Sequence, residues 1–429
     1  KDQIGMVASV TKWAALASNA SDVPGVVREA FDQLGSGRPR PVEIEVPPDV
    51  LMGRQEVELA EPGPVTPVEG DSNELDRAAG LLGAAKRPII YAGSGVITSG
   101  ATGELRVLAE MLGAPVAMSP NAKGALSSEH PLALTAAGGY EMVPEADVIL
   151  AVGTRFSMPS WLGTSWKLGP DQKFIHLDID KDEVGRTSTP TVGIVSDARR
   201  GLGEITRRVS RHNAARESQE ETVQATRDAI GEKLGGLSPL TEYAAAIREA
   251  LPRDGILVDE STQVGYYSRE GFPVYEPRTY VTSGYQGTLG YGFATALGAK
   301  VGNPDKAVVS INGDGGFMYN VQELATMVQH QIGAVAIVFN DNAFGNVRRT
   351  QDTRFDGHII ATDLHNPDFV ALAHSFGVAG IRATDPDQLL KVLKHAIETD
   401  APTLIEVPLG VMPSPSFLPP ADIQKHHKV

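Results

Sequence analysis

The chain has 429 residues, of which 41% are hydrophobic, and its glycines and prolines are scattered along its length. We therefore expect an ordinary α/β protein of roughly two to three domains. The net charge of −15 argues against binding to nucleic-acid phosphates, which needs a basic face. The absence of cysteine excludes disulfides, thiolate metal sites and cysteine nucleophiles, and it fits a cytoplasmic location. No signal peptide or apolar run of membrane-spanning length is recognisable, so we expect no membrane partner.

The first 50 residues carry few signs of regular structure. We expect one helix near residues 23–35 and one strand near residues 41–46, which is too little for a domain with its own core. Residues 51–71 are rich in Pro, Glu and Val without a clear period, so this segment is interpreted as a linker.

Helices and strands alternate from residue 72 onwards. The apolar periodicity predicts helices over residues 74–85 and 104–112, and strands over residues 88–93, 115–119, 148–153 and 174–180. This alternation is typical of a doubly wound parallel sheet. We expect a central Rossmann-like domain over residues 72–213, followed by an exposed helical connector over residues 214–236.

Two glycine turns and one histidine stand out in this central domain. Gly93-Ser94-Gly95 and Gly153-Thr154-Arg155 both follow strands, where glycine turns bind nucleotides in some folds. A role in packing is favoured here, because the fuller dinucleotide pattern with a trailing acid is missing. His130 lies in a loop without an identifiable partner acid or nucleophile, so we expect a structural hydrogen bond rather than catalysis.

The last domain is expected over residues 237–429. A strand over residues 255–259 leads into Glu260-Ser261-Thr262, which either caps a helix or belongs to a binding site. The stretch SGYQGTLGYGF, residues 283–293, precedes a helix of small residues that runs through Lys300. Its glycines allow the backbone to approach a ligand or another element closely.

The most specific pattern of the chain lies within residues 308–349. A strand over residues 308–311 is followed by Gly313-Asp314-Gly315-Gly316, by a helix with Asn320 as its expected N-cap, and by a second strand over residues 334–339. This βαβ unit should bring Asp314 and the loop Asn340-Asp341-Asn342 to one edge of the sheet. Two carboxylates suit Mg²⁺ or Ca²⁺ there, while glycine N–H groups and a helix N-terminus suit a diphosphate. Either motif alone is more often a simple turn or polar loop, but together they are much more specific.

The GDG sequence, followed after 24 residues by Asn340-Asp341-Asn342, resembles the thiamine diphosphate motif of the acetolactate synthase and pyruvate decarboxylase superfamily. The resemblance covers almost the whole chain, and it implies thiamine diphosphate held through Mg²⁺. Asp314 and Asp341 resemble the side-chain metal ligands, with Asp341 in place of the commoner Asn, and the Ala343 carbonyl resembles the main-chain ligand. By the same resemblance, the Gly287 carbonyl meets the pyrimidine amino group and Leu289 holds thiamine bent, so both are assigned catalytic roles. The implied cofactor-binding set is Glu260, Ser261, Gly287, Thr288, Leu289, Gly313, Asp314, Gly315, Gly316, Asp341, Ala343, Phe344 and Gly345.

The resemblance also bears on domains, assembly and a second cofactor. Residues 1–50 resemble the end of the family's pyrimidine-binding domain, and residues 237–429 its diphosphate-binding domain. We expect about the first hundred residues of a family member to be missing, including the glutamate that hydrogen-bonds the aminopyrimidine. The family's quaternary structure implies a homodimer or homotetramer. Some members hold FAD in the central domain, but the run TRFSMPSW around Arg155 departs from the acetolactate synthase pattern, so we do not expect FAD.

The resemblance implies an enzyme that acts on a small 2-oxo acid by decarboxylation and carboligation. Asn346 and Thr350 stand where acetolactate synthases have Met and Trp, which weakens acetolactate as the expected product. A simple decarboxylase or lyase of the same family is the alternative. From other classes, a catalytically silent regulatory or structural homologue and a nucleotide-binding dehydrogenase remain open.

Overall fold

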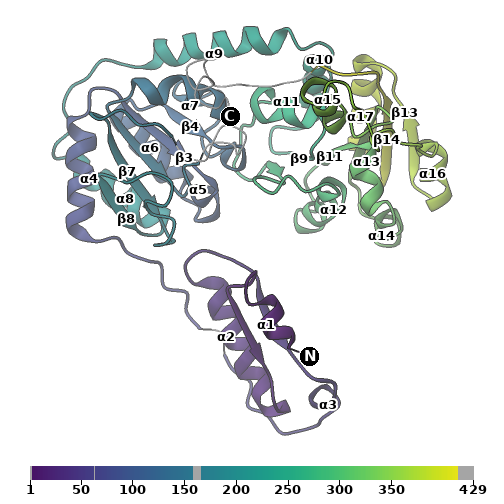
Figure 1. Cartoon of the computed structure of the whole chain (residues 1–429), viewed down its shortest axis with the longest axis horizontal. Coiled ribbons are helices and arrows are strands. Elements are labelled where there is room, and N and C mark those ends of the chain that lie inside the picture. Colours follow the sequence, from purple (N-terminus) through teal and green to yellow (C-terminus); the bar gives the residue numbers. More distant parts are fainter. Residues whose placement is uncertain (1, 62, 158–165, 414–429) are drawn as a thin grey trace.

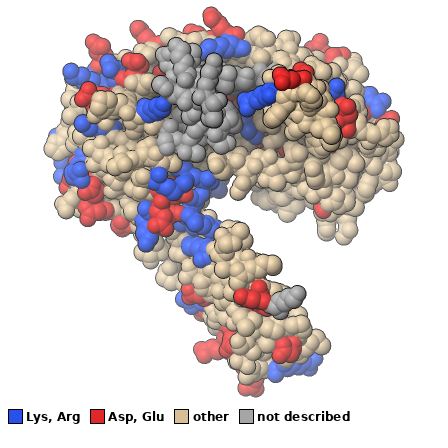
Figure 2. All heavy atoms as spheres, in the orientation of Figure 1, with Lys and Arg blue, Asp and Glu red and all other residues tan. Residues whose placement is uncertain are grey.

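The computed structural model describes residues 2–61, 63–157 and 166–413. Figure 1 shows a small N-terminal unit below two larger α/β domains, which the long helix α9 (Glu220–Gly235) joins across the top. The α/β class with doubly wound parallel sheets is confirmed, because both large sheets contain only parallel strand pairs. On the face shown in Figure 2, basic and acidic side chains of the described residues are interspersed.

The N-terminal unit is a two-stranded parallel sheet with one long helix. The expected helix and strand are present. A second strand, β1, was not predicted, and it pairs Trp13 with Val42 of the expected strand. No residue of either strand is fully buried, and a two-stranded sheet alone is at best marginally stable. The elements are α1 (Gln3–Val7), β1 (Trp13–Leu16), η1 (Ala20–Asp22), α2 (Val23–Gly35), β2 (Val42–Glu45) and α3 (Pro48–Leu51).

The central sheet has the order β5-β4-β3-β6-β7-β8. All four strands predicted for this domain are present, and β3 and β6 are buried along their whole length. Leu105, Leu108 and other apolar residues of the flanking helices pack against one face of the sheet, and Phe156 and Trp166 against the other. The strands are β3 (Pro88–Ala92), β4 (Val116–Met118), β5 (Ala133–Leu134), β6 (Val148–Val152), β7 (Lys173–Asp178) and β8 (Val192–Val195). The helices are α4 (Ser72–Ala84), α5 (Ser94–Thr98), α6 (Thr102–Leu112), η2 (Pro120–Ala122), α7 (Ala136–Met142), η3 (Val143–Glu145) and α8 (Ala198–Val209).

The C-terminal sheet has the order β10-β9-β11-β12-β14-β13, and it also carries helices on both faces. The strands are β9 (Ile256–Asp259), β10 (Tyr280–Thr282), β11 (Val308–Gly313), β12 (Val335–Asn340), β13 (Ala379–Arg382) and β14 (Thr403–Pro408). The helices are α10 (Leu240–Ala250), α11 (Gln263–Gly271), α12 (Tyr291–Gly302), α13 (Asp314–Phe317), η5 (Met318–Asn320), α14 (Glu323–Gln329), α15 (Gly345–Arg354), α16 (Phe369–Phe376) and α17 (Pro386–Thr399). Among the described residues, no helix is both long and apolar enough to cross a membrane.

The predicted N-cap at Asn320 is wrong. Helical structure begins at Asp314, directly after Gly313, and α14 has Gln322 at its N-cap without a side-chain capping bond. The Asn320 amide instead donates to the carbonyl of Gly290, 2.6 Å away. A long-range contact therefore takes the side chain that local rules assign to the cap.

The strand order places a switch point in the C-terminal sheet between β9 and β11. From β9 the chain moves to one side, to β10, and then returns to β11 and β12 on the other side. In such sheets, ligands bind outside the carboxyl ends of the strands at the point where the order reverses. Glu260 follows β9 and Asp314 follows β11, so both lie at this point.

Candidate active site

Asp314 and Asp341 lie at the ends of neighbouring strands. Gly313 at the end of β11 pairs with Phe339 of β12, and each aspartate follows within two residues. Burial raises the pKa of Asp314. Burial, followed by the charge of Asp314, raises the pKa of Asp341 to about 6. Two buried carboxylates, one of which raises the pKa of the other, form a site that a divalent cation would stabilise.

The loop after β12 contacts Asp341 through Ala343, whose N–H donates to Oδ1 of Asp341 at 3.3 Å. Asn342 has a φ of 53°, a left-handed conformation that Asn tolerates better than most residues. Phe344 N–H donates to the Thr362 carbonyl and Leu364 N–H to that of Asn342, each at 2.8 Å. Within the described residues, no hydrogen bond ends on the carbonyl of Ala343. This carbonyl is therefore available as the third oxygen ligand.

Gly345 lets the N-terminus of α15 approach Asp341. A methyl group at Gly345 would overlap Oδ2 of Asp341, so only glycine fits at this position. Among the described residues, no group of three or more His, Cys, Asp or Glu side chains could hold a metal. The two carboxylates and the Ala343 carbonyl would thus need oxygens from a ligand or water to complete a Mg²⁺ shell.

A polar network that the sequence did not predict supports Asp314. Asn366 Nδ2 donates to Oδ2 of Asp314 at 2.6 Å and to Oδ1 of Asn340 at 3.0 Å. Asn340 Nδ2 donates to Glu406 at 2.9 Å, and Arg382 donates to the other oxygen of Glu406 at 2.8 Å. Asn366 is 52 positions from Asp314 and belongs to no motif, so only the fold brings it here.

Gly315 and Gly316 are required by their protein neighbours. A methyl group at Gly316 would overlap the carboxylate of Glu260, and one at Gly315 would overlap the ring of Phe344. The turn after β11 therefore packs tightly against the segment after β9 and the loop after β12. Contact of these two glycines with a diphosphate stays a prediction.

Glu260 holds the glycine-rich loop from within the protein. Its carboxylate is fully buried and accepts hydrogen bonds from the N–H groups of Gly290, at 2.6 Å, and Gly292, at 3.1 Å. Burial raises its pKa, while these two amides lower it. Both amides lie at the start of α12, whereas α11, which follows residues 260–262, has Thr262 as its N-cap without a side-chain capping bond. Residues 260–262 therefore do not cap their own helix through a side chain, and their place in a binding site stays a prediction.

The predicted pyrimidine contacts lie on this loop. Gly287 and Gly290 adopt φ values of 60° and 79°, which favour glycine. Ser261 Oγ donates to the Gly287 carbonyl at 3.3 Å, and Leu289 is half-buried beside exposed Thr288. The loop thus reaches the same sheet edge as the carboxylates, and we define residues 283–290 as the thiamine loop.

His130 and the two glycine turns of the central domain have structural partners. His130 Nε2 lies 3.2 Å from Glu110, and its Nδ1 accepts from the N–H of Leu132. A methyl group at Gly93 would overlap the carbonyl of Gly153, and one at Gly95 would overlap the Cα of Gly153. The glycines therefore allow two turns to pack against each other, in line with the packing interpretation.

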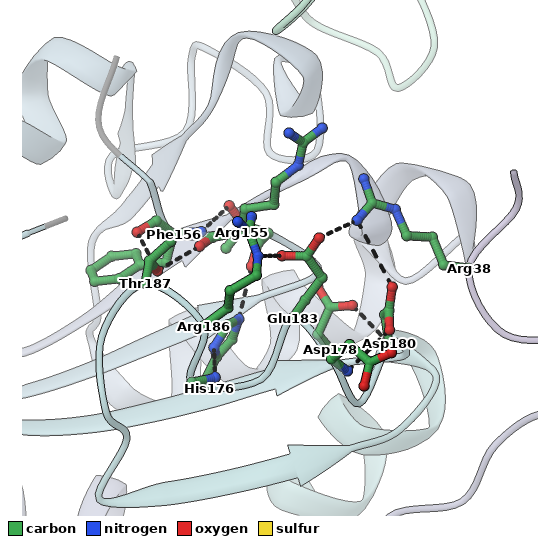
Figure 3. A network of polar contacts seen from close by, with 12 residues as sticks. Arg38, Arg155, Phe156, His176, Asp178, Asp180, Glu183, Arg186 and Thr187 are labelled. Carbon is green, nitrogen blue, oxygen red and sulfur yellow. Dashed lines mark hydrogen bonds and ion pairs between the residues drawn. The ribbon is translucent and has the colours of Figure 1, made fainter. Parts of the chain in front are cut away.

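A charged network surrounds Arg155 in the central domain. Figure 3 shows Arg38 and Arg186 reaching Glu183 from opposite sides, each at 2.6 Å. The Arg155 guanidinium instead lies over the ring of Tyr285 in the thiamine loop, 4.7 Å from its centroid. Glu183 is thus already paired with two arginines of the chain, and the absence of FAD stays a prediction.

The fold, together with the edge of the C-terminal sheet at which Asp314 and Asp341 lie, defines a parallel α/β protein with a diphosphate-type site. Comparison with known proteins agrees. Residues 261–407 match the family model "Thiamine pyrophosphate enzyme, C-terminal TPP binding domain", and residues 75–205 match "Thiamine pyrophosphate enzyme, central domain". A probable acetolactate synthase large subunit of Methanocaldococcus jannaschii is 32% identical over 98% of this chain and 75% of its own length. The corresponding protein of Methanococcus aeolicus is 30% identical with the same coverage. Acetolactate synthase isozyme 3 large subunit of Escherichia coli is 31% identical over 92% of this chain and 73% of its length.

The chain therefore belongs to the thiamine pyrophosphate enzymes, as a homologue of acetolactate synthase large subunits. The predicted family is confirmed, and with it the diphosphate-binding type of the C-terminal domain.

Proposed function

We propose that this protein is a Mg²⁺- and thiamine diphosphate-dependent enzyme that acts on a 2-oxo acid by decarboxylation and carboligation. The observation that supports this most is the pairing of Asp314 with Asp341 at the switch point, beside the available carbonyl of Ala343. Their donor set fits a hard divalent cation that is completed by diphosphate oxygens.

The residues have separate tasks in this proposal. Asp314, Asp341 and the Ala343 carbonyl would hold the metal, and the N-termini of α13 and α15 would supply positive potential for the diphosphate. Gly287 and Leu289 hold the thiamine end. Bound thiamine diphosphate supplies the nucleophile and electron sink for the 2-oxo acid. The buried Glu260 keeps the thiamine loop in place, so that the cofactor meets a preorganised surface.

The fate of the substrate depends on α15. The Thr350 hydroxyl donates to the Asn346 carbonyl at 2.9 Å, so its polar group is turned onto the helix. Thr350 leaves more space than the Trp of acetolactate synthases, which favours an altered acceptor. Simple decarboxylation is the second candidate, and product analysis with pyruvate separates carboligation products from acetaldehyde.

The metal site is tested by Asp314→Ala, which removes a ligand and leaves the diphosphate under-neutralised. Calorimetry with Mg²⁺ and thiamine diphosphate should show a loss of affinity of at least tenfold, or about 1.4 kcal/mol. Asp352→Ala is the matched control, because Asp352 is an exposed carboxylate on α15. Equal affinity in wild type and Asp314→Ala would overturn the assignment.

We further propose a homodimer or homotetramer. Large apolar side chains lie exposed around the site, including Tyr285 (63% exposed), Tyr319 (59%) and Val347 (51%). Burying them against another copy would remove apolar surface from water, as in obligate interfaces. Light scattering at micromolar concentration is the test, and a monomer that binds the cofactor tightly would refute this.

A further inference from the structure

Lys123 of the central domain inserts its ammonium group into the C-terminal domain. The residue is only 4% exposed, and Nζ donates to three carbonyls at the end of α11. The acceptors are Ser268, Arg269 and Phe272, at 2.7, 3.0 and 2.8 Å. A lysine has three N–H donors, so all of them are used. The last carbonyls of a helix lack partners within it and form its negative end, so this ammonium caps α11 from another domain.

The helix that Lys123 caps begins at the active site. Its N-cap is Thr262, and Glu260 and Ser261 precede it directly. The nine residues of α11 span about 13 Å at 1.5 Å per residue. A helix of this length moves as one body, so its fixed end constrains the position of residues 260–262.

A second series of contacts connects Lys123 with the segment that contains Glu260. Nζ lies 4.9 Å from the centroid of the Tyr280 ring, and the Tyr280 hydroxyl donates to Asp259 at 3.0 Å. Arg269 of α11 also donates to this oxygen of Asp259, at 3.1 Å. Asp259 is fully buried and directly precedes Glu260. Both routes therefore end at the carboxylate that holds the thiamine loop.

We infer that Lys123 is a positioning residue of the thiamine site. Its ammonium fixes α11, and through α11 it sets where Glu260 and Ser261 hold the thiamine loop. This inference rests on the proposed function. It implies that a residue of the central domain contributes to cofactor binding in the C-terminal domain. No motif in the sequence connects the segment around Lys123 with α11.

The matched control is another cation that bridges the same two domains. Arg278 of the C-terminal domain donates to the carbonyl of Ile97 in α5 at 2.9 Å. This contact mirrors that of Lys123, because here the C-terminal domain supplies the donor and the central domain the helix. Arg278→Gln removes an interdomain hydrogen bond without touching α11, so it reports what loss of domain contact alone does.

The experiment compares Lys123→Met, Lys123→Arg and Arg278→Gln in the full chain. Calorimetry with Mg²⁺ and thiamine diphosphate should show affinity lowered on the order of tenfold in Lys123→Met, since hydrogen bonds from a charged donor are lost. Lys123→Arg should recover at least part of this loss, and Arg278→Gln should bind as wild type does. Hydrogen exchange of the metal-free protein should be faster in residues 283–290 in Lys123→Met alone.

The outcomes separate the inference from the proposed function. If wild type binds no thiamine diphosphate, the proposed function fails. If wild type binds and Lys123→Met binds equally well, with unchanged exchange in the thiamine loop, only the inference is overturned. Should Lys123→Met not fold, Lys123→Gln replaces it, because this change removes the charge but keeps a hydrogen-bond donor for the end of α11. Weaker binding in Lys123→Gln supports the inference, and unchanged binding overturns it.

Discussion

Asp341→Asn tests the electrostatics of the carboxylate pair directly. The substitution keeps an oxygen and the size of the side chain but removes one charge. The pKa of Asp341 is raised from 3.8 to about 6 by burial and by Asp314. At about 1.4 kcal/mol per pKa unit, the raised pKa corresponds to a change of at most about 3 kcal/mol in the free energy of unfolding. Because the carboxyl is only partly buried, solvent screening reduces the expected effect to about 1 kcal/mol.

The sign follows from proton linkage. The folded, metal-free protein holds the Asp341 proton more tightly than the unfolded chain does, so this stabilisation is present below pH 3.8 and is lost as pH rises through about 6. The side-chain amide of the Asp341→Asn variant does not titrate, so this variant does not lose stability in this way as pH rises. We therefore expect metal-free Asp341→Asn to match wild type near pH 4 and to be more stable by about 1 kcal/mol at pH 8.

Urea unfolding in a chelator at several pH values measures this difference. Asp352→Asn is the control, because its carboxylate is exposed and its change should not depend on pH in this way. With saturating Mg²⁺ and thiamine diphosphate the order should reverse, since a carboxylate is the stronger ligand. The reasoning is refuted if metal-free Asp341→Asn has the same stability relative to wild type at pH 4 and pH 8.

Three further substitutions test separate parts of the site. Gly345→Ala should weaken Mg²⁺-dependent cofactor binding by about tenfold or more, because its methyl group overlaps Asp341. Gly298→Ala in α12 is the control: its methyl group meets no neighbour within 4 Å, so it should raise the free energy of unfolding by about 0.5–1 kcal/mol. Calorimetry and urea unfolding measure both, and equal cofactor affinity in the two variants would contradict this packing. Glu260→Gln keeps an acceptor for only one of the Gly290 and Gly292 amides, because the other would face an NH2 group, and it should cost about 1–3 kcal/mol of unfolding free energy together with cofactor affinity. An unchanged affinity would show that Glu260 is not needed to hold the thiamine loop. Thr350→Trp should change the ratio of carboligation to decarboxylation products from pyruvate, and a constant ratio would place the acceptor pocket elsewhere.

The sequence predicted the buried parallel strands well. β3, β6 and most of β12 are continuous apolar runs that are covered on both faces, so their composition alone marks them. The strands β1, β5, β8, β10, β13 and β14 were not predicted. β1 and β5 are short and contain alanine, which has little strand preference. Their pairing partners, and not their own residues, decide that they are strands.

The site was predictable where its residues are close in sequence to a glycine turn. Asp314 and Asp341 follow strands of one βαβ unit, so topology alone brings them together. Asn366 and Lys123 were missed for a different reason. Each acts through one side chain that reaches another element, and neither carries a periodic or motif-like pattern around it.

The helix α9 has a practical consequence for anyone who recombines these enzymes. Val223, near its start, belongs to the core of the central domain, while Ile230 and Leu234, near its end, belong to the core of the C-terminal domain. A chimera whose crossover falls after α9 would place the last turns of one parent's helix in the other parent's core. A crossover within residues 210–219 would instead break the pairing of Val223 with its own domain. Either junction combines side chains from two parents in one of the two cores. The central domain, α9 and the C-terminal domain should therefore be taken together from one parent.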